Sequence, residues 1–271
     1  MKKNKSVLLS APYIIFMVIF TLIPLGVVGF YALTDPDTGA FSLRNIRELG
    51  MYMPVLWQSI LYSLVSAFIC LLLGYPVAYY IAQCKPITQK LLYMLVMLPM
   101  CMSFLLRTLA WVGLLQDTGI INNFLDWIGI GRIRMIRTPG AVILGMVYNY
   151  LPYMILPLYA TIVKIDKRLI EAAEDLGCNG VQTFQKVTLP LSMPGILSGI
   201  TMVFVPAVST FYISQKLGGT DTVLIGDVIE RLFKQGNNAN LGAALSLVLM
   251  LLVFVCTGIM NRFGGDEEVI V

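Results

Sequence analysis

The sequence has no histidine and few charged residues: Asp, Glu, Lys and Arg make up 13% of its 271 residues, against about 25% in a typical soluble domain. Without histidine, imidazole metal sites and Ser-His or Cys-His nucleophile pairs are excluded. The five cysteines have no paired spacing, so we expect small apolar core residues and no metal or cofactor. The phosphate-loop pattern G-x-x-x-x-G-K-[ST] is also absent. These absences predict a protein that is not itself an enzyme.

Apolar sequence is abundant instead, with 58% hydrophobic residues and a mean hydropathy of +0.80. Each of six apolar runs is long enough for a helix of roughly 20 residues to cross a bilayer: residues 7–33, 55–83, 91–115, 141–163, 191–215 and 241–260. The short alternating segments of a membrane β-barrel are not seen. We therefore predict an all-α membrane protein with six transmembrane helices in one domain, residues 1–271. The first run is longer than a signal-peptide core, so we expect it to remain as a helix.

The six runs contain no Asp or Glu. Proton-coupled carriers generally need an ionisable group at membrane depth, and an acid is not available here for that purpose. Arg107 is the one charged residue well inside a run, and we expect its guanidinium to extend outward to the interface. The energy for any transport must then come from a separate subunit.

The basic residues indicate the orientation in the cell membrane. Lys2, Lys3 and Lys5 precede the first run, and the short second connection carries Lys85 and Lys90 without an acid. Because Lys and Arg are enriched in cytoplasmic loops, we predict a multi-pass protein with both termini in the cytoplasm. The connection after the fourth run, residues 171–190, then also faces the cytoplasm.

That connection, EAAEDLGCNGVQTFQKVTLP, is the most informative stretch of the chain. Good helix formers precede Gly177, which stands where a helix end needs a residue that tolerates positive φ. A second short helix is expected at about residues 181–187. The small side chains of Ala172 and Ala173 permit close approach of a partner, and Glu171 is available to a partner's Arg or Lys.

This connection resembles the cytoplasmic coupling loop, or EAA motif, of the membrane subunits of ATP-binding-cassette (ABC) importers. The matching positions are Glu171, Ala172, Ala173, Gly177, Val187, Leu189 and Pro190. The family usually has isoleucine where this chain has Val187. The resemblance implies the type I importer permease (MetI-like) fold and a knob that sits in a cleft of a separate ABC ATPase dimer. Because such a dimer has two clefts, a second homologous permease subunit is also expected.

Longer segments resemble the permeases of bacterial spermidine/putrescine importers over about residues 91–252. They are MVYNYLPYMILPLYATIVKIDKRLIEAAEDLG, FYISQKLGGTDTVLIGDVIERLF, IRTPGAVILG and NLGAALS. The resemblance implies a polyamine substrate and an extracellular polyamine-binding protein, with lipid around the chain and no nucleic acid. The same type of permease for ferric iron, sulfate, thiamine or another small solute remains an alternative, as does a self-sufficient carrier or channel. A membrane enzyme is a third reading, but without histidine or acids in the apolar runs it would have few acid–base groups outside the loops.

A linear polycation is attracted to aromatic faces and carboxylates. The candidates for the substrate pathway are four tyrosines in or beside the fourth and fifth runs and three acids of the last outer connection: Tyr148, Tyr150, Tyr153, Tyr212, Asp221, Asp227 and Glu230.

Two further patterns concern packing. Gly195 and Gly199 form a small-xxx-small pair, which predicts a close helix contact in the fifth run. Residues 115–130, with Trp127, predict a short amphipathic helix along the outer interface.

Overall fold

The computed structural model describes residues 12–13, 15–35, 39–42, 44–220, 222–234 and 238–264, and these residues are almost entirely helical. The chain divides into two compact units. One comprises residues 1–54 and 228–252, and the other comprises residues 55–227 and 253–271, so that the boundaries fall inside or beside helices. By length and hydropathy, the described residues include five helices able to cross a membrane, or six if a bent pair counts as one span. The prediction of an all-α membrane protein is confirmed.

The first unit contains a π-helical turn η1 (Val18–Leu22), α2 (Ile23–Ala32), α3 (Arg44–Glu48), the 3-10 turn η2 (Leu49–Tyr52) and most of α14 (Ile225–Lys234) and α15 (Ala239–Gly264). Two buried asparagines hold the chain where α2 ends. Asn45 donates to the carbonyls of Ala32 and Thr34 at 3.1 and 3.0 Å, and Asn240 also donates to the Thr34 carbonyl. These side chains satisfy carbonyls that the end of α2 leaves without a helical partner.

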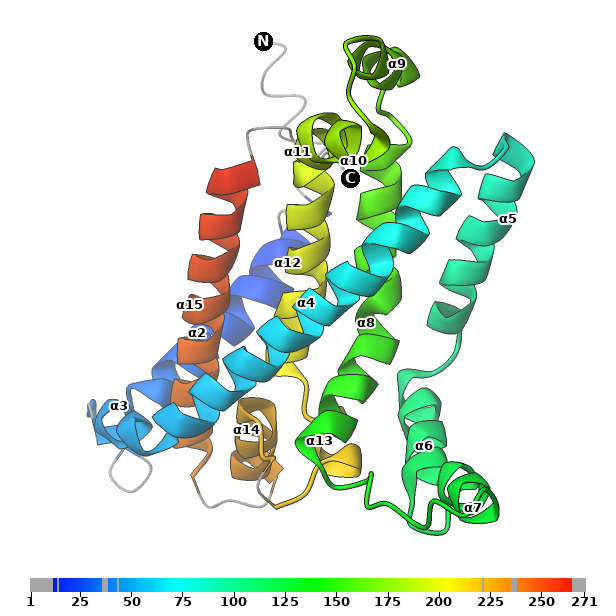
Figure 1. The fold of residues 1–271 in the computed structure, drawn as a ribbon. Helices are drawn as coiled ribbons and strands as arrows, with labels where there is room; N and C mark the ends of the chain where they lie inside the picture. The colour runs from blue at the N-terminus through cyan, green and yellow to red at the C-terminus, as the bar shows by residue number, and fades with distance from the viewer. Residues whose placement is uncertain are drawn as a thin grey trace, which may run out of the picture. The chain divides into compact units, whose positions relative to one another are not determined.

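The second unit contains α4 (Met53–Gln83), α5 (Pro86–Met97), the 3-10 turn η3 (Leu98–Cys101), α6 (Phe104–Leu115), α7 (Ile120–Trp127) and α8 (Pro139–Ile162). These are followed by α9 (Lys167–Asp175), α10 (Gly180–Thr183), η4 (Phe184–Thr188), α11 (Leu189–Leu191), α12 (Met193–Ser209) and α13 (Tyr212–Leu217). In Figure 1, α9, α10 and α11 gather at one end of α8, and α6, α7 and α13 lie toward its other end.

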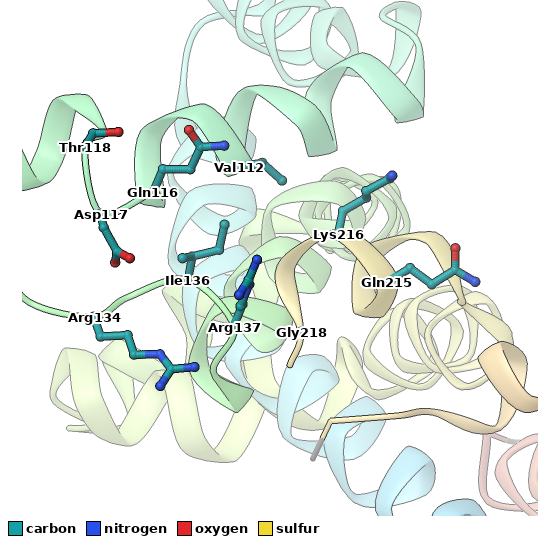
Figure 2. A pocket seen from close by; sticks show the side chains of 10 residues that line it. All are labelled: Val112, Gln116, Asp117, Thr118, Arg134, Ile136, Arg137, Gln215, Lys216 and Gly218. Atoms are coloured by element: carbon teal, nitrogen blue, oxygen red, sulfur yellow. The ribbon is translucent and has the colours of Figure 1, made fainter. Parts of the chain in front are cut away.

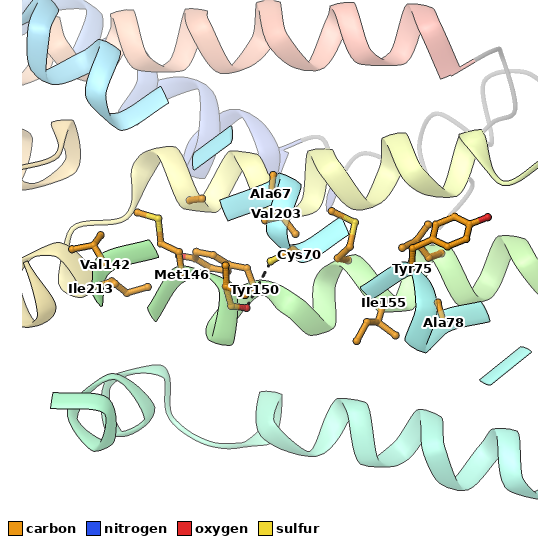
Figure 3. Packing of buried hydrophobic residues seen from close by; sticks show 14 of the residues in the cluster. Ala67, Cys70, Tyr75, Ala78, Val142, Met146, Tyr150, Ile155, Val203 and Ile213 are labelled. Atoms are coloured by element: carbon orange, nitrogen blue, oxygen red, sulfur yellow. Dashed lines mark hydrogen bonds between the residues drawn. The ribbon is translucent and has the colours of Figure 1, made fainter. Parts of the chain in front are cut away.

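Helix α8 is the centre of the second unit. Its side chains Val142, Met146, Met154 and Leu158 are fully buried. They pack with residues of α4, α12 and α13, including Cys70 and Val203 (Figure 3). A helix that is apolar and buried on most sides must pack against other elements on most sides. Helix α8 is therefore the central helix of the second unit.

A close helix contact joins α12 to α8, and it depends on the predicted glycine pair. A Cβ at Gly195 would lie 2.6 Å from Thr161 Oγ1, and one at Gly199 would lie 2.6 Å from Met154 Sδ and 3.3 Å from the Met154 carbonyl oxygen. Glycine is therefore what allows the two backbones to approach this closely. The predicted close packing is confirmed.

The second, fourth and sixth runs match α4, α8 and α15 within a few residues. The third run, expected as one helix over residues 91–115, is instead interrupted. Helix α5 ends at Met97, and Met102 and Ser103 have extended backbones before α6 begins at Phe104. Pro99 lacks an N–H and its ring crowds the preceding turn, so the α-helix does not continue there.

The fifth run, expected over residues 191–215, is also shorter. Helix α12 meets the helical stretch 180–191 at a 63° bend. It ends at Ser209, because Thr210 is extended, and the short helix α13 follows. Within residues 115–130 a helix does form, over the shorter range of α7, and its apolar residues Ile120, Phe124 and Trp127 are exposed while Asn122 is fully buried. Its position at the outer interface stays a prediction. Exposed apolar side chains on this face suit an interfacial position.

The α8–α12 contact gives a first prediction. Gly199→Val should destabilise the protein by about 1–3 kcal/mol, because the added branches meet Met154 and the core has no room to accept them. The melting temperature of the purified protein in detergent is the measurement.

Gly258→Val is the matched control, since a Cβ at Gly258 of α15 would meet nothing within 4 Å. Adding Met154→Ala to Gly199→Val should recover part of the lost stability. Equal melting temperatures for the two glycine variants would contradict the close contact.

Candidate functional site

The predicted coupling segment begins with α9, which follows α8 after a short turn. Asp166 caps its N-terminus, where the carboxylate accepts a hydrogen bond from the Arg168 backbone N–H at 3.0 Å. Asp and Asn are favoured at this position because they satisfy a backbone donor that the helix leaves free.

Gly177 ends α9 as predicted, with φ of +85°. Its N–H bonds the Glu174 carbonyl at 2.9 Å, and the Cys178 N–H bonds the Ala173 carbonyl at 3.0 Å. This pair of bonds is the Schellman motif, in which a left-handed residue satisfies the last carbonyls of the helix. The turn therefore uses a conformation that glycine adopts without steric cost.

The second helical stretch is longer than residues 181–187, the range that the sequence predicts. It runs through α10, η4 and α11 over residues 180–191. Asn179 and Gln182 form a reciprocal capping box at its start, with bonds of 2.9 and 3.0 Å. The box fixes the beginning of the helix, which explains why helical structure starts before Val181.

The two predicted alanines do not face the same way. Glu171 and Ala172 are exposed, but Ala173 is only 8% exposed and faces the rest of the segment. The expectation that both alanines form an open contact face is wrong for Ala173. Adjacent helical positions point about 100° apart, so one of the two is turned inward.

An exposed apolar stripe was not anticipated from the sequence. Leu169, Ala172 and Leu176 are three and four positions apart on α9, and Leu169 and Leu176 are 49% and 87% exposed. Val181, at the start of the next helix, is 66% exposed. The helical spacing of apolar residues within a polar connection was the available signal. We call Leu169, Ala172, Leu176 and Val181 the apolar stripe.

The last three motif residues lie within η4 and α11, close to the bend before α12. Val187 and Leu189 are half-buried, and Pro190 is exposed. Proline near the start of a helical stretch needs no backbone N–H partner, so Pro190 is compatible with the observed turn.

Helix α4 anchors the second stretch through aromatic and polar contacts. The Phe184 ring meets the rings of Tyr75 and Tyr79 edge-on, with centroids 5.5 and 6.0 Å apart. The hydroxyls of Tyr75 and Ser192 lie 2.8 Å apart, and Ser192 is fully buried at the 63° bend. The predicted coupling segment is thus attached to α4 through Phe184, and through Ser192, which follows it.

The structure places the four tyrosines predicted for the pathway on α8 and α13. Tyr148 packs edge-on against Trp111 at 5.3 Å, and Tyr150 is buried with its hydroxyl donating to the Pro206 carbonyl at 3.3 Å. The rings of Tyr150 and Tyr153 lie 6.4 Å apart. Tyr212 carries the Lys216 ammonium over its face at 5.8 Å.

The structure describes two of the three candidate acids, Asp227 and Glu230, and neither has a free carboxylate. Asp221 lies outside the described residues. Asp227 is 3% exposed, and its carboxylate accepts from the Leu224 N–H at 3.0 Å near the start of α14. Glu230 pairs with Lys234 at 2.6 Å. An acid in the first turn of a helix is well placed to satisfy free backbone donors, which explains the burial of Asp227.

Arg107 also departs from expectation. Its side chain does not extend to solvent, because the residue is 6% exposed. Its Nε and Nη1 have no hydrogen-bond partner among the described residues, and it lies close enough to Tyr150 to interact electrostatically. The cause is the interruption of the third run: α6 begins only at Phe104, so Arg107 sits in its first turn, packed against other helices.

A polar pocket of about 820 Å³ lies at the other end of α8. The end of α6, the residues before α8 and the end of α13 line it: Val112, Gln116, Asp117, Thr118, Arg134, Ile136, Arg137, Gln215, Lys216 and Gly218. In Figure 2, Asp117 and Arg134 lie toward one side of the pocket and Lys216 toward the other, with Arg137 between them in this view. We call this site the basic pocket. The sequence analysis missed it, because its residues come from three separate stretches of the chain.

The chain belongs to the family described as binding-protein-dependent transport system inner membrane components, which it matches over residues 6–264. It is therefore a multi-pass membrane subunit of a transport system.

Individual relatives support the same assignment. The chain is 38% identical to the spermidine/putrescine transport system permease protein PotB of Escherichia coli (strain K12), over 88% of this chain and 90% of the relative. It is 41% identical to the PotB protein of Haemophilus influenzae, over 89% and 88%. A crystal structure of a bacterial ABC transporter that imports alginate matches the fold with a TM-score of 0.77 and 21% identity, covering 98% of this chain and 97% of that one.

The anchor of the coupling segment gives a second prediction. Phe184→Ala should lower the free energy of unfolding by roughly 1–3 kcal/mol, since it removes two aromatic contacts and leaves a gap beside α4. Thermal unfolding in detergent measures this loss. Phe184→Leu, which retains apolar volume, should lose less.

Gln185→Ala is the matched control, because Gln185 is exposed on the same helical turn. A loss for Gln185→Ala as large as that for Phe184→Ala would contradict the anchoring contact.

Proposed function

We propose that this chain is a permease subunit of an ATP-driven ABC importer and forms, with a second homologous permease, the pathway for spermidine or putrescine. The proposed substrate rests on the 38–41% identity to spermidine/putrescine permeases over almost nine-tenths of the chain. An ABC ATPase dimer supplies the energy, and an extracellular polyamine-binding protein delivers the substrate. The chain does not hydrolyse ATP.

The coupling segment is the site through which the ATPase acts. Residues 171–190 lie within two capped helical stretches, residues 167–175 and 180–191, which are joined through Gly177. The apolar stripe offers desolvation energy to a cleft in the partner, and the exposed Glu171 offers a carboxylate to its Arg or Lys. Closure of the ATPase dimer then pulls on α4 through Phe184 and Ser192, and on α12 through the bend.

The substrate is tested in proteoliposomes that contain this chain, a second permease, the ATPase and the binding protein. Labelled spermidine and putrescine should accumulate with ATP, and excess sulfate, thiamine or ferric iron should not compete. Accumulation of one of those solutes instead would assign the alternative substrate. Uptake by this chain alone would point to a self-sufficient carrier or channel and overturn the proposed function.

The turn of the coupling segment gives a third prediction. Gly177→Val should uncouple ATP hydrolysis from uptake, because a β-branched residue is strained at a φ of +85°. The ratio of polyamine molecules imported to ATP hydrolysed is expected to fall several-fold.

Gly180→Val is the control, since Gly180 has open space around it and no positive φ. Normal coupling in Gly177→Val, with a loss in Gly180→Val, would count against the role of this turn.

The apolar stripe gives a fourth prediction, which separates folding from docking. Leu176 is 87% exposed, so Leu176→Asp should leave the melting temperature unchanged. It should weaken binding of the ATPase about tenfold or more, because a carboxylate is costly to bury in an apolar contact. Co-purification of the ATPase with the permease pair measures the effect.

Ile87→Asp is the matched control. Ile87 is an 81% exposed apolar residue in the first turn of α5, outside the coupling segment. Unchanged ATPase binding by Leu176→Asp would exclude the stripe from the interface.

A further inference from the structure

Arg107 is a buried cation about halfway along the central helix of the second unit. It is 6% exposed, and its guanidinium interacts electrostatically with Tyr150. Tyr150 is the twelfth of the 24 residues of α8 counted from Pro139, so it lies midway along that helix. A guanidinium stays protonated in proteins, and a charge at this depth in a membrane is costly unless an opposite charge accompanies it.

The acids that the structure describes do not supply this opposite charge. The six apolar runs contain no Asp or Glu. Within the described ranges, none of the ion pairs involves Arg107, and its Nε and Nη1 donate to no acceptor. Water molecules can accept from these donors, but they do not balance a full positive charge. The balancing charge must then come from outside these residues.

The start of α6 presents further unpaired donors to the same place. Helix α6 has 12 residues and begins after the interruption of the third run, and Ser103 at its N-cap makes no side-chain cap hydrogen bond. The Arg107 N–H closes the first turn on the Ser103 carbonyl at 3.1 Å, so the N–H groups of residues 104–106 point to the open end of the helix. Helical side chains lean toward the N-terminus, which directs the Arg107 guanidinium to the same end.

Both features attract an anion. The start of a helix carries roughly half a positive charge, and the N-termini of interrupted membrane helices commonly face anionic groups. A polyamine is a cation, so the ligand of this site is not the proposed substrate. We infer that Arg107 and the start of α6 form a binding site for a monovalent anion of the size of chloride. Because the guanidinium and the helix start together exceed one positive charge, the occupied site remains slightly positive.

Chloride suits this site better than a larger anion does. The phosphate of a lipid headgroup stays outside the hydrocarbon core, whereas Arg107 lies beside the middle of α8. A carboxylate of a second permease would have to reach a side chain that is 6% exposed. A single ion needs less room, and the exposed Ser103 leaves it a way to the start of α6.

The test compares chloride with an anion that is too large for the site. The melting temperature of the purified chain in detergent is measured in sodium chloride and in sodium gluconate of equal ionic strength. A ligand that binds only the folded state stabilises it, so wild type should melt about 5 °C higher at saturating chloride. Arg107→Met removes the charge at similar side-chain length and should abolish this difference.

Arg132→Met is the matched control. Arg132 is exposed and pairs with Asp126 at 3.5 Å, so its variant should keep the full response to chloride. Equal melting temperatures of wild type in the two salts would overturn the inference, as would an undiminished chloride response in Arg107→Met.

A binding measurement on wild type keeps the inference testable if Arg107→Met does not fold. Radiolabelled chloride should bind the purified chain saturably in a scintillation proximity assay, and unlabelled bromide should displace it. Absence of saturable binding would overturn the inference.

The complete importer separates chloride from a carboxylate of the second permease. Chloride binding is measured again with both permeases and the ATPase in nanodiscs of neutral phosphatidylcholine. Retained binding supports the site, whereas loss of binding on assembly would assign the position to the partner's carboxylate and overturn the assignment to chloride. These measurements contain no polyamine, so their failure leaves the proposed function standing, and failure of polyamine uptake leaves the anion site standing.

Discussion

The contact on which the second unit depends is the close packing of α12 on α8. Gly195 and Gly199 bring the α12 backbone against Thr161 and Met154, and a single added methyl group at either glycine would lie about 2.6 Å from a side chain of α8. In lipid, helices gain little from apolar burial, so close van der Waals packing and satisfied polar groups must hold them together. The coupling segment lies between the end of α8 and the start of α12 in the chain. The contact between these two helices therefore fixes where the segment is attached.

In the coupling segment, the residues that stabilise the fold differ from the apolar residues that are exposed. Its inward residues, Ala173, Thr183 and Phe184, hold it together and attach it to α4. Its caps, Asp166 and Asn179, satisfy the free backbone donors at the two helix starts. The apolar stripe contributes to neither task and remains outside. A short segment can remain ordered with apolar residues exposed because capping and anchoring, and not the stripe, supply its stability.

Much of this architecture follows from the sequence. The apolar runs predict α4, α8 and α15 within a few residues, and the glycine at position 177 predicts a left-handed helix end. The errors fall where several local signals compete. Hydropathy continues through Pro99 and Thr210, although the backbone changes direction at both positions, because apolar content measures length in lipid and not helical continuity.

The candidate site was less accessible to sequence reasoning for a different reason. The EAA pattern is local, so one window contains it. The basic pocket joins residues from three separate stretches of the chain, and the burial of Asp227 depends on how the start of α14 folds back on Leu224. A count of charges in a loop does not show which of them face solvent.

The described tyrosines indicate how weakly the membrane part would hold a polycation. Tyr212 already carries the Lys216 ammonium over its ring, and Tyr150 lies beside the buried Arg107. Were these two rings to line the pathway, an arriving ammonium group would meet positive charge at both, which opposes the attraction of the aromatic face. The six apolar runs contain no acid to offset this charge. A transport pathway must release the solute that it binds. A pathway with cations of its own and few carboxylates binds a polycation weakly, which favours release. Strong selection of the solute then belongs to a protein outside the membrane, and the permease contributes passage and the mechanical connection to ATP.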